Sequence, residues 1–243
     1  TSVKKKKISA MDLFSALIKE RAETGRIYIM NVDHCNTHSS FKDKVYMSNL
    51  CQEITLPTKP LEHIDDPEGE IALCILSAIN VGTLRDLDEL EELCELAVRA
   101  LEEIIDYQRY PIKAAEVSTK ARRSLGVGYI GLAHFLAKNH VKFEDKESWQ
   151  LVHDLSEAFQ YYLLKASNKL AEERGACEYF DRTKYSEGIL PIDTYKEELD
   201  NIVGKKLKYD WNSLRKSIRD HGLRHSTLSA QMPSESSSVV SNA

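Results

Sequence analysis

Apolar residues recur every three or four positions along most of the chain, which is the spacing of one face of an α-helix. The first such segment predicts a helix over about 9–24, where Ser9 and Asp12 form a capping box and Gly25 ends the pattern. Residues 86–108 place leucine, alanine and isoleucine on one face and glutamates on the other. The same periodicity predicts helices over about 115–137, 148–174, 193–202 and 211–221.

Shorter apolar runs between these helices predict strands. Residues 26–32 are rich in β-branched and aromatic side chains, and residues 71–80 are apolar on both faces, as in a strand covered by helices. Residues 49–54 and 226–230 are expected to be shorter extended pieces. Because helices alternate with apolar strands and no internal repeat is visible, we predict a helix-rich α/β fold in which loops at strand ends carry the site.

The segment from Asn49 to Glu53 combines an amide, a thiol and a carboxylate at every second position. In an extended backbone such residues share one face at a spacing of about 6.5–7 Å, so Asn49, Cys51 and Glu53 would project together. They would supply a hydrogen-bonding group, a nucleophile or hydrogen-atom donor, and a base. Taken alone, a surface strand with an incidental cysteine is the simpler interpretation.

Two other segments resemble known site patterns only in part. His34, Cys35 and His38 are metal-type ligands, but no second His/Cys cluster lies at a usable spacing, so a turn capped by Asp33 and Asn36 with a half-buried Cys35 is favoured. The glycines of 126–131 match G-x-G-x-x-G, but polar, helix-like residues precede them where a dinucleotide site needs a strand. We interpret these glycines as a helix-packing face.

The remaining cysteines and the C-terminal serines have simple structural interpretations. Cys74 lies within an apolar run and is expected to be an inert core thiol, while Cys94 and Cys177 are expected to pack in the core. The serine-rich residues 233–238 read first as a disordered tail. The alternative is a turn whose hydroxyl and backbone N–H groups open a helix and hold a phosphate.

Composition excludes several classes of protein. With 33 Lys+Arg against 38 Asp+Glu, the net charge of -5 gives no field that would hold nucleic acid. No apolar run approaches the roughly 18 residues of a membrane span, and charged residues interrupt the place where a signal peptide would have its apolar core. The five cysteines are an odd number and form no CxxC pair, which argues against a disulfide scaffold. We therefore expect an intracellular, cytoplasmic protein.

Four blocks of sequence together resemble the large, catalytic (alpha) subunit of class I ribonucleotide reductase. The four blocks are Asn31-Val32-Asp33-His34-Cys35-Asn36-Thr37-His38, Ser48-Asn49-Leu50-Cys51-Gln52-Glu53-Ile54-Thr55-Leu56-Pro57-Thr58, Trp211-Asn212-Ser213-Leu214, and Gly222-Leu223-Arg224-His225-Ser226-Thr227-Leu228-Ser229-Ala230 with Pro233. Their order and separation also fit that family. The resemblance covers nearly the whole chain.

The resemblance implies a role for each of several residues. Cys51 would become the thiyl radical that removes the ribose 3′ hydrogen, Glu53 would take the 3′-hydroxyl proton, and Asn49 would bind the substrate and assist. Cys74 would be one half of the dithiol that reduces the 2′ position. Substrate would contact Asn49, Leu50, Cys51, Gln52 and Glu53, and its diphosphate would contact Pro233, Ser234, Glu235, Ser236 and Ser237. Because a thiyl radical survives only away from solvent, Cys51 should lie on a loop inside a barrel.

The resemblance also implies an organisation. The chain would be roughly the second half of a ten-stranded α/β barrel, with a catalytic loop at about 47–58, a helical layer at about 86–221 and the phosphate-binding segment at 233–237. The family's N-terminal regulatory region, its C-terminal tail and the partner cysteine of Cys74 are not in this sequence. We therefore expect a gene fragment, or a chain that works beside companion chains.

The implied activity is the reduction of ribonucleoside diphosphates to deoxyribonucleoside diphosphates for DNA synthesis. This chain would bind no metal or cofactor itself: a metal-containing small (beta) subunit would supply the radical, ATP or dNTP effectors would bind elsewhere, and thioredoxin or glutaredoxin would re-reduce the dithiol. Neither nucleic acid nor a membrane is an expected partner. The alternatives are a non-catalytic remnant or assembly module of the same fold, and a dehydrogenase that binds a nucleotide at residues 126–131.

Overall fold

The computed structural model describes residues 3–204 and 206–243. The chain divides into two compact units, residues 1–31 and residues 32–243. Each unit is described by itself. No helix within the described residues is long and apolar enough to cross a membrane.

The first unit is built around helix α1 (Ala10–Thr24), which confirms the predicted helix. The Ser9 hydroxyl accepts a hydrogen bond from the Asp12 backbone N–H, and Gly25 ends the helix in the left-handed conformation with its N–H bonded to the Arg21 carbonyl. The predicted strand at 26–32 is wrong. Within the described part of the chain, residues 26–31 pair with no other strand, so the β-branched pattern there has no ladder to join.

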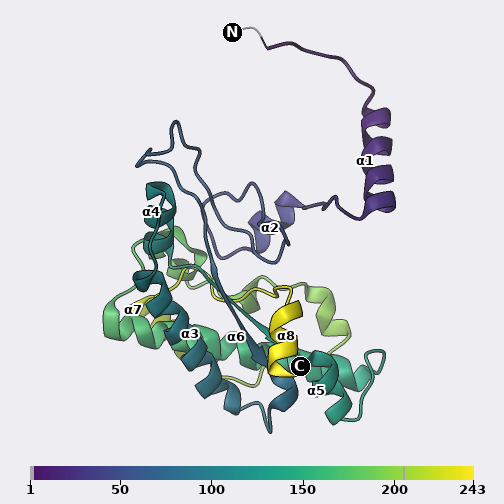
Figure 1. Cartoon of the computed structure of the whole chain (residues 1–243). Coiled ribbons are helices and arrows are strands. Elements are labelled where there is room, and N and C mark those ends of the chain that lie inside the picture. Colours follow the sequence, from purple (N-terminus) through teal and green to yellow (C-terminus); the bar gives the residue numbers. More distant parts are fainter. Residues whose placement is uncertain (1–2, 205) are drawn as a thin grey trace. The chain divides into compact units, whose positions relative to one another are not determined.

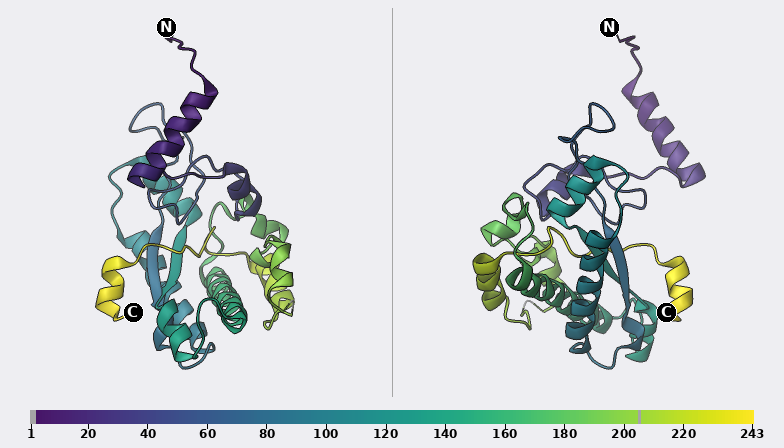
Figure 2. Two further views of the ribbon diagram at one scale, coloured as in Figure 1. Left: turned by 90° about the vertical axis from the view of Figure 1, so that its right-hand side faces the viewer. Right: turned by 60° about the vertical axis from the view of Figure 1, so that its left-hand side comes forward.

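The second unit contains a small parallel sheet. Strand β1 (Ile75–Asn80) pairs in parallel with β2 (Leu125–Ile130), and the two strands lie side by side (Figure 2, left). In the register of this pair, Ile75 lies opposite Leu125. Residues 227–230 run along the other edge of β2, where the Val127 N–H donates to the Leu228 carbonyl at 2.8 Å and Val127 bridges Ser229 in parallel. The order is therefore β1, β2, then 227–230.

Helices connect these parallel segments, as parallel pairing requires. Between β1 and β2 lie α3 (Glu89–Tyr107) and α4 (Lys113–Arg122). Between β2 and residues 227–230 lie α5 (Leu132–Lys138), α6 (Lys146–Arg174) and α7 (Trp211–His221). This strand–helix alternation confirms the α/β prediction and fits a part of an α/β barrel.

The single helix predicted over about 115–137 is wrong, because this stretch contains α4, β2 and α5. Gly126 and Gly128 lie inside the strand, not on a helix face. A Cβ atom at Gly126 would lie 2.5 Å from Leu76 Cδ2, and one at Gly128 would lie 2.5 Å from the Ala230 carbonyl oxygen. The absence of a side chain at these glycines therefore lets neighbouring segments of the same chain approach the strand closely.

The core lies where α3 packs against α6 and against both strands. From α3 it takes Leu90, Cys94, Val98, Leu101 and Ile105, and from α6 it takes Leu155, Ala158, Leu163 and Leu170. Cys94 and Cys177 are buried, as predicted, and burial raises the pKa of each thiol to about 12. The predicted helix at 193–202 is only a pair of 3₁₀ turns, Pro191–Asp193 and Glu197–Asn201.

The remaining elements are short. Helix α2 (Val32–His38) opens the second unit, and α8 (Glu235–Ser241) follows the last extended segment. Three further 3₁₀ turns cover Val81–Thr83, Phe180–Arg182 and Lys184–Glu187. Figure 1 shows α8 beside the carboxyl end of β1, where Asn80 Nδ2 donates to the Ser241 carbonyl at 3.1 Å.

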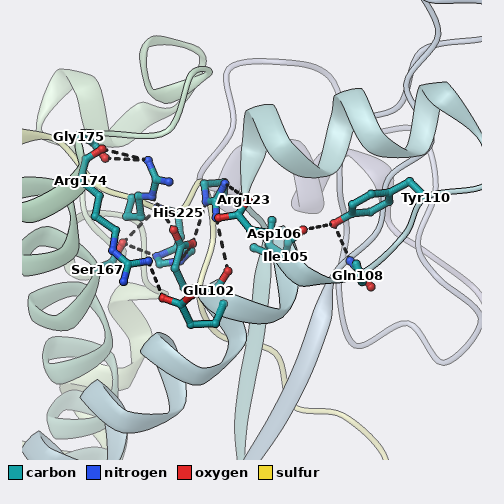
Figure 3. Close-up of polar contacts among 12 residues, drawn as sticks. Glu102, Ile105, Asp106, Gln108, Tyr110, Arg123, Ser167, Arg174, Gly175 and His225 are labelled. Atoms are coloured by element: carbon teal, nitrogen blue, oxygen red, sulfur yellow. Dashed lines mark hydrogen bonds and ion pairs between the residues drawn. The ribbon is translucent and has the colours of Figure 1, made fainter.

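A buried charge network fixes the chain just before residues 227–230 (Figure 3). Glu102 of α3 is fully buried and accepts hydrogen bonds from Arg123 Nε at 2.8 Å, Arg224 Nε at 2.7 Å and His225 Nε2 at 3.0 Å. Burial alone would raise the pKa of Glu102, but the three donors outweigh it and hold the pKa well below its usual range. Burial lowers the pKa of His225, whose Nδ1 meets the Ser167 hydroxyl at 2.9 Å.

Candidate functional site

Residues 49–54 form a closed turn. The Asn49 N–H donates to the Ile54 carbonyl at 3.3 Å, and the Asn49 side-chain oxygen accepts from the Ile54 N–H at 3.3 Å. Within the turn the Gln52 N–H donates to the Asn49 carbonyl at 3.2 Å, and Gln52 has a φ of 61°. Asn49 therefore fastens both ends of the loop with its backbone and its amide.

This turn corrects the expectation of an extended segment with Asn49, Cys51 and Glu53 on one face. Because the chain reverses direction through the left-handed Gln52, side chains no longer alternate between two faces. Leu50 and Cys51 lie in the turn and are exposed in this chain, with Leu50 84% exposed. Cys51 does lie on a loop, as predicted, but the described chain leaves it open to solvent.

Glu53 lies at the base of the turn, in a more enclosed environment. It is half-buried, and its Oε2 atom is fully buried with no hydrogen-bond partner among the described residues. The neighbouring Ile54 is buried and reaches the face of β2 that Gly126 leaves open, with its Cδ1 3.9 Å from where a Cβ of that glycine would be. The glycine strand therefore positions the base of the loop.

Cys74 lies close enough to Glu53 for the two groups to interact electrostatically. Cys74 immediately precedes β1 and is half-buried, which corrects the expectation of an inert thiol inside a strand. Burial raises the pKa of the Cys74 thiol, and the negative charge of Glu53 raises it further. The structure thus brings a thiol and a carboxylate from separate segments to one place.

Two cavities meet at Glu53. One of about 250 Å³ is bounded by the base of the loop, by α6 and by the turns around residues 184–194. The second, of about 280 Å³, lies against β2. Both are lined by Glu53, Gln160 and Ser229, and the Ser229 hydroxyl donates to Gln160 Oε1 at 2.9 Å.

Besides Glu53, these cavities are lined by Gln160, Thr227 and Ser229, to which sequence reasoning assigned no role in the site. Thr227 and Ser229 carried a usable signal, because they alternate with the buried Leu228 and Ala230 as a two-faced strand requires. Gln160 carried none, since a single polar residue between aromatic residues of a long helix has no distinctive spacing.

The serine-rich segment opens helix α8 and is not a tail without structure. Ser234 precedes the first turn, Glu235 begins the helix, and the Ser238 N–H bonds the Ser234 carbonyl at 2.8 Å. This is the helix-opening alternative raised from sequence, and Asn80 attaches the far end of the helix to the sheet.

The segment from Asp33 to His38 is a helix, α2, which corrects the predicted turn. Asn36 fastens it to the next loop: its Nδ2 donates to the Val45 carbonyl at 2.9 Å and its Oδ1 accepts from the Val45 N–H at 2.8 Å. Cys35 is half-buried, as predicted. Within the described residues, no group of three or more His, Cys, Asp or Glu side chains is arranged to hold a metal ion.

The glycines of 126–131 do not form a dinucleotide-binding turn. Gly126 and Gly128 lie within β2, and Gly131 precedes α5. A phosphate loop needs its first glycines in the turn after the strand, where the backbone can approach a pyrophosphate. In this chain Ala230 and Met232 lie against those glycines instead.

Comparison with known proteins gives consistent matches over the whole chain. The model of the ribonucleotide reductase barrel domain matches residues 1–243. The chain is 59% identical to the ribonucleoside-diphosphate reductase subunit alpha of Haemophilus influenzae and 58% identical to ribonucleoside-diphosphate reductase 1 subunit alpha of Escherichia coli, in each case over all of this chain and 32% of the relative. It is 45% identical to the subunit alpha of Enterobacteria phage T4 over 99% of this chain. The chain spans about a third of the length of these relatives.

Proposed function

The chain belongs to the ribonucleotide reductase family, and from this premise we propose that it forms part of the catalytic barrel of a ribonucleoside-diphosphate reductase. The observation that carries the proposal is the loop of residues 49–54, which presents the Cys51 thiol and holds the Glu53 carboxylate at its base, where the charge of Glu53 raises the pKa of a second thiol, Cys74. These are the groups that radical reduction of a ribose requires.

In this proposal Cys51 is the radical residue. A partner small subunit oxidises its thiol to a thiyl radical, which takes the 3′ hydrogen atom of the ribose while Glu53 takes the 3′-hydroxyl proton. The short loop suits these two roles of Cys51 and Glu53. Asn49 joins the two ends of the loop through its hydrogen bonds with Ile54 and so holds the thiol in a fixed position relative to the carboxylate. The Asn49 amide and the backbone of residues 50–52 contact the substrate.

Cys74 supplies half of the reducing equivalents. Cys74 and a second cysteine outside this chain lose two electrons and form a disulfide, the 2′-hydroxyl leaves as water, and the ribonucleoside diphosphate becomes its deoxy form. Burial and the negative charge of Glu53 raise the pKa of this thiol, so Cys74 enters the step carrying its proton. A thioredoxin- or glutaredoxin-type dithiol then re-reduces the disulfide.

Residues 233–237 contact the diphosphate of the substrate. Ser234, Ser236 and Ser237 place hydroxyl groups around the start of α8, and Asn80 holds the other end of that helix to the carboxyl end of β1. Sites in parallel α/β folds gather at the carboxyl ends of the strands. Companion chains or further parts of the same subunit complete the barrel, and effector nucleotides bind elsewhere.

Reconstitution of CDP reduction tests the proposal. The chain is combined with the remaining parts of an alpha subunit and a radical-generating beta subunit, and Cys51→Ser and Glu53→Gln are compared with Cys35→Ser, a half-buried cysteine with no assigned role. We expect Cys51→Ser to abolish turnover, Glu53→Gln to reduce kcat by about 10²–10⁴, and Cys35→Ser to retain activity. Equal activity of Cys51→Ser and the unsubstituted chain would favour a non-catalytic assembly module.

A further inference from the structure

The cavity of about 250 Å³ beside Glu53 has the features of a hydrated channel. Each water occupies about 30 Å³ in the liquid, so several molecules fit. Besides Glu53, its lining includes four residues with hydroxyl groups, Ser40, Thr55, Thr227 and Ser229. The lining also includes His38, an exposed residue, so the cavity reaches the protein surface.

Unsatisfied polar atoms occur in residues of the cavity wall. Among the described residues, five buried side-chain atoms have no hydrogen-bond partner, and two of them, Glu53 Oε2 and Ser39 Oγ, belong to residues that line it. Buried polar atoms of this kind are normally satisfied by ordered water. The cation in the wall does not satisfy the carboxylate, because Lys184 Nζ is held by the carbonyl oxygens of Asn36 at 3.0 Å and Thr37 at 2.8 Å.

We propose that this cavity is a proton route that connects the Glu53 carboxyl group to solvent through water and the polar walls formed by Gln160, Thr227 and Ser229. The inference rests on the proposed function, in which Glu53 takes a proton from substrate. Gln160 and Ser229 stand where the two cavities meet, so they control passage between the loop base and the channel.

The proton balance of the reaction shows why protons must move between solvent and the site. When an external dithiol reduces the disulfide, its two thiol protons are released outside, and Cys74 and its partner cysteine, which leave as thiolates, must each gain one inside. In the proposed step a cavity water donates a proton to the Glu53 carboxylate, Glu53 passes a proton to the Cys74 thiolate, and solvent restores the water. No electron moves in this transfer, and no net proton is consumed.

The test uses the reconstituted enzyme and variants that make the channel wall apolar. Gln160→Leu and the isosteric Thr227→Val are compared with Gln150→Leu, which removes the same amide from the same helix outside both cavities. We expect Gln160→Leu to lower kcat about tenfold, less than loss of the base itself, with the KM for CDP within about twofold. The solvent deuterium isotope effect on kcat should rise, Thr227→Val should show the same change more weakly, and Gln150→Leu should show neither.

Three results would overturn the proton route. An unchanged kcat and isotope effect in both channel variants would show that protons do not pass here. A lower kcat with an unchanged isotope effect would assign Gln160 a structural role. Independently of activity, high-resolution diffraction should show water hydrogen-bonded to Glu53 Oε2 and Ser39 Oγ, and a cavity without water would refute the inference. Activity of the Cys51→Ser variant would instead refute the proposed function.

Discussion

The substitution Glu102→Gln tests how strongly the buried charge network holds the fold. It keeps the shape of the side chain but removes the negative charge that faces Arg123, Arg224 and His225. Removing one partner of a buried ion pair typically costs about 3–5 kcal/mol, because the remaining charge stays buried. Arg123 keeps its bonds to Asp106 at 2.6 and 3.1 Å, which favours the lower end of that range, about 3 kcal/mol. For a chain of this size the melting temperature should fall by about 6–12 °C.

The matched control is Glu116→Gln on α4. Glu116 also contacts two cations, Lys113 at 3.1 Å and Lys120 at 2.9 Å, but at the protein surface. Exposed pairs contribute about 1 kcal/mol or less, so urea denaturation followed by circular dichroism should show a small loss. If Glu102→Gln lowers the free energy of unfolding no more than Glu116→Gln, the assignment of the network as a stabilising core is wrong.

Three further predictions concern pH, thiol reactivity and the glycine strand. Because burial lowers the pKa of His225, the unfolded state binds more protons than the folded state below about pH 6.5. The free energy of unfolding, measured by urea titration, should therefore fall from pH 7.5 to pH 5.5. His225→Gln should make this dependence on pH weaker. Mass spectrometry after brief alkylation should find the exposed Cys51 labelled and the buried Cys94 unlabelled. Adding the remaining parts of the barrel should slow the labelling of Cys51. Equal labelling rates of Cys51 and Cys94 would contradict the loop geometry. Gly128→Ala should cost about 1–3 kcal/mol in denaturant unfolding, because the new Cβ would meet the Ala230 carbonyl at 2.5 Å, and a neutral result would argue against that contact.

Elements with purely local signals could be predicted from the sequence almost to the residue. Helix α7 is an example: the Asp210 side chain caps its start by accepting from the Ser213 N–H, and Trp211, Leu214 and Ile218 bury one face. Strand β2 could not be predicted in this way. Its two edges are held by β1 and by residues 227–230, which are distant in sequence, and its glycines are explained only by what packs on them.

The candidate site shows a different limit of sequence reasoning. The sequence singles out Asn49, Cys51 and Glu53, but the assumed extended geometry fails because a strand needs a partner and this segment has none among the described residues. Nothing in the sequence marks Gln52 for a positive φ, since the residues most often found there are glycine and asparagine. The loop conformation instead depends on the Asn49–Ile54 bonds, which only the folded structure reveals.

The turn gives the two reactive groups of the loop different surroundings, and this has a consequence for how the site is assembled. The surroundings of Glu53, at the base of the turn, are formed by residues of this chain. Strand β2 and Ile54 position it, its charge acts on Cys74, and the cavity lined by Gln160 lies next to it. Cys51 is exposed here, and a thiyl radical needs exclusion of solvent. Under the proposed function, the acid–base half of the site would therefore be built by these residues, and the parts of the barrel that close over the turn would protect the radical.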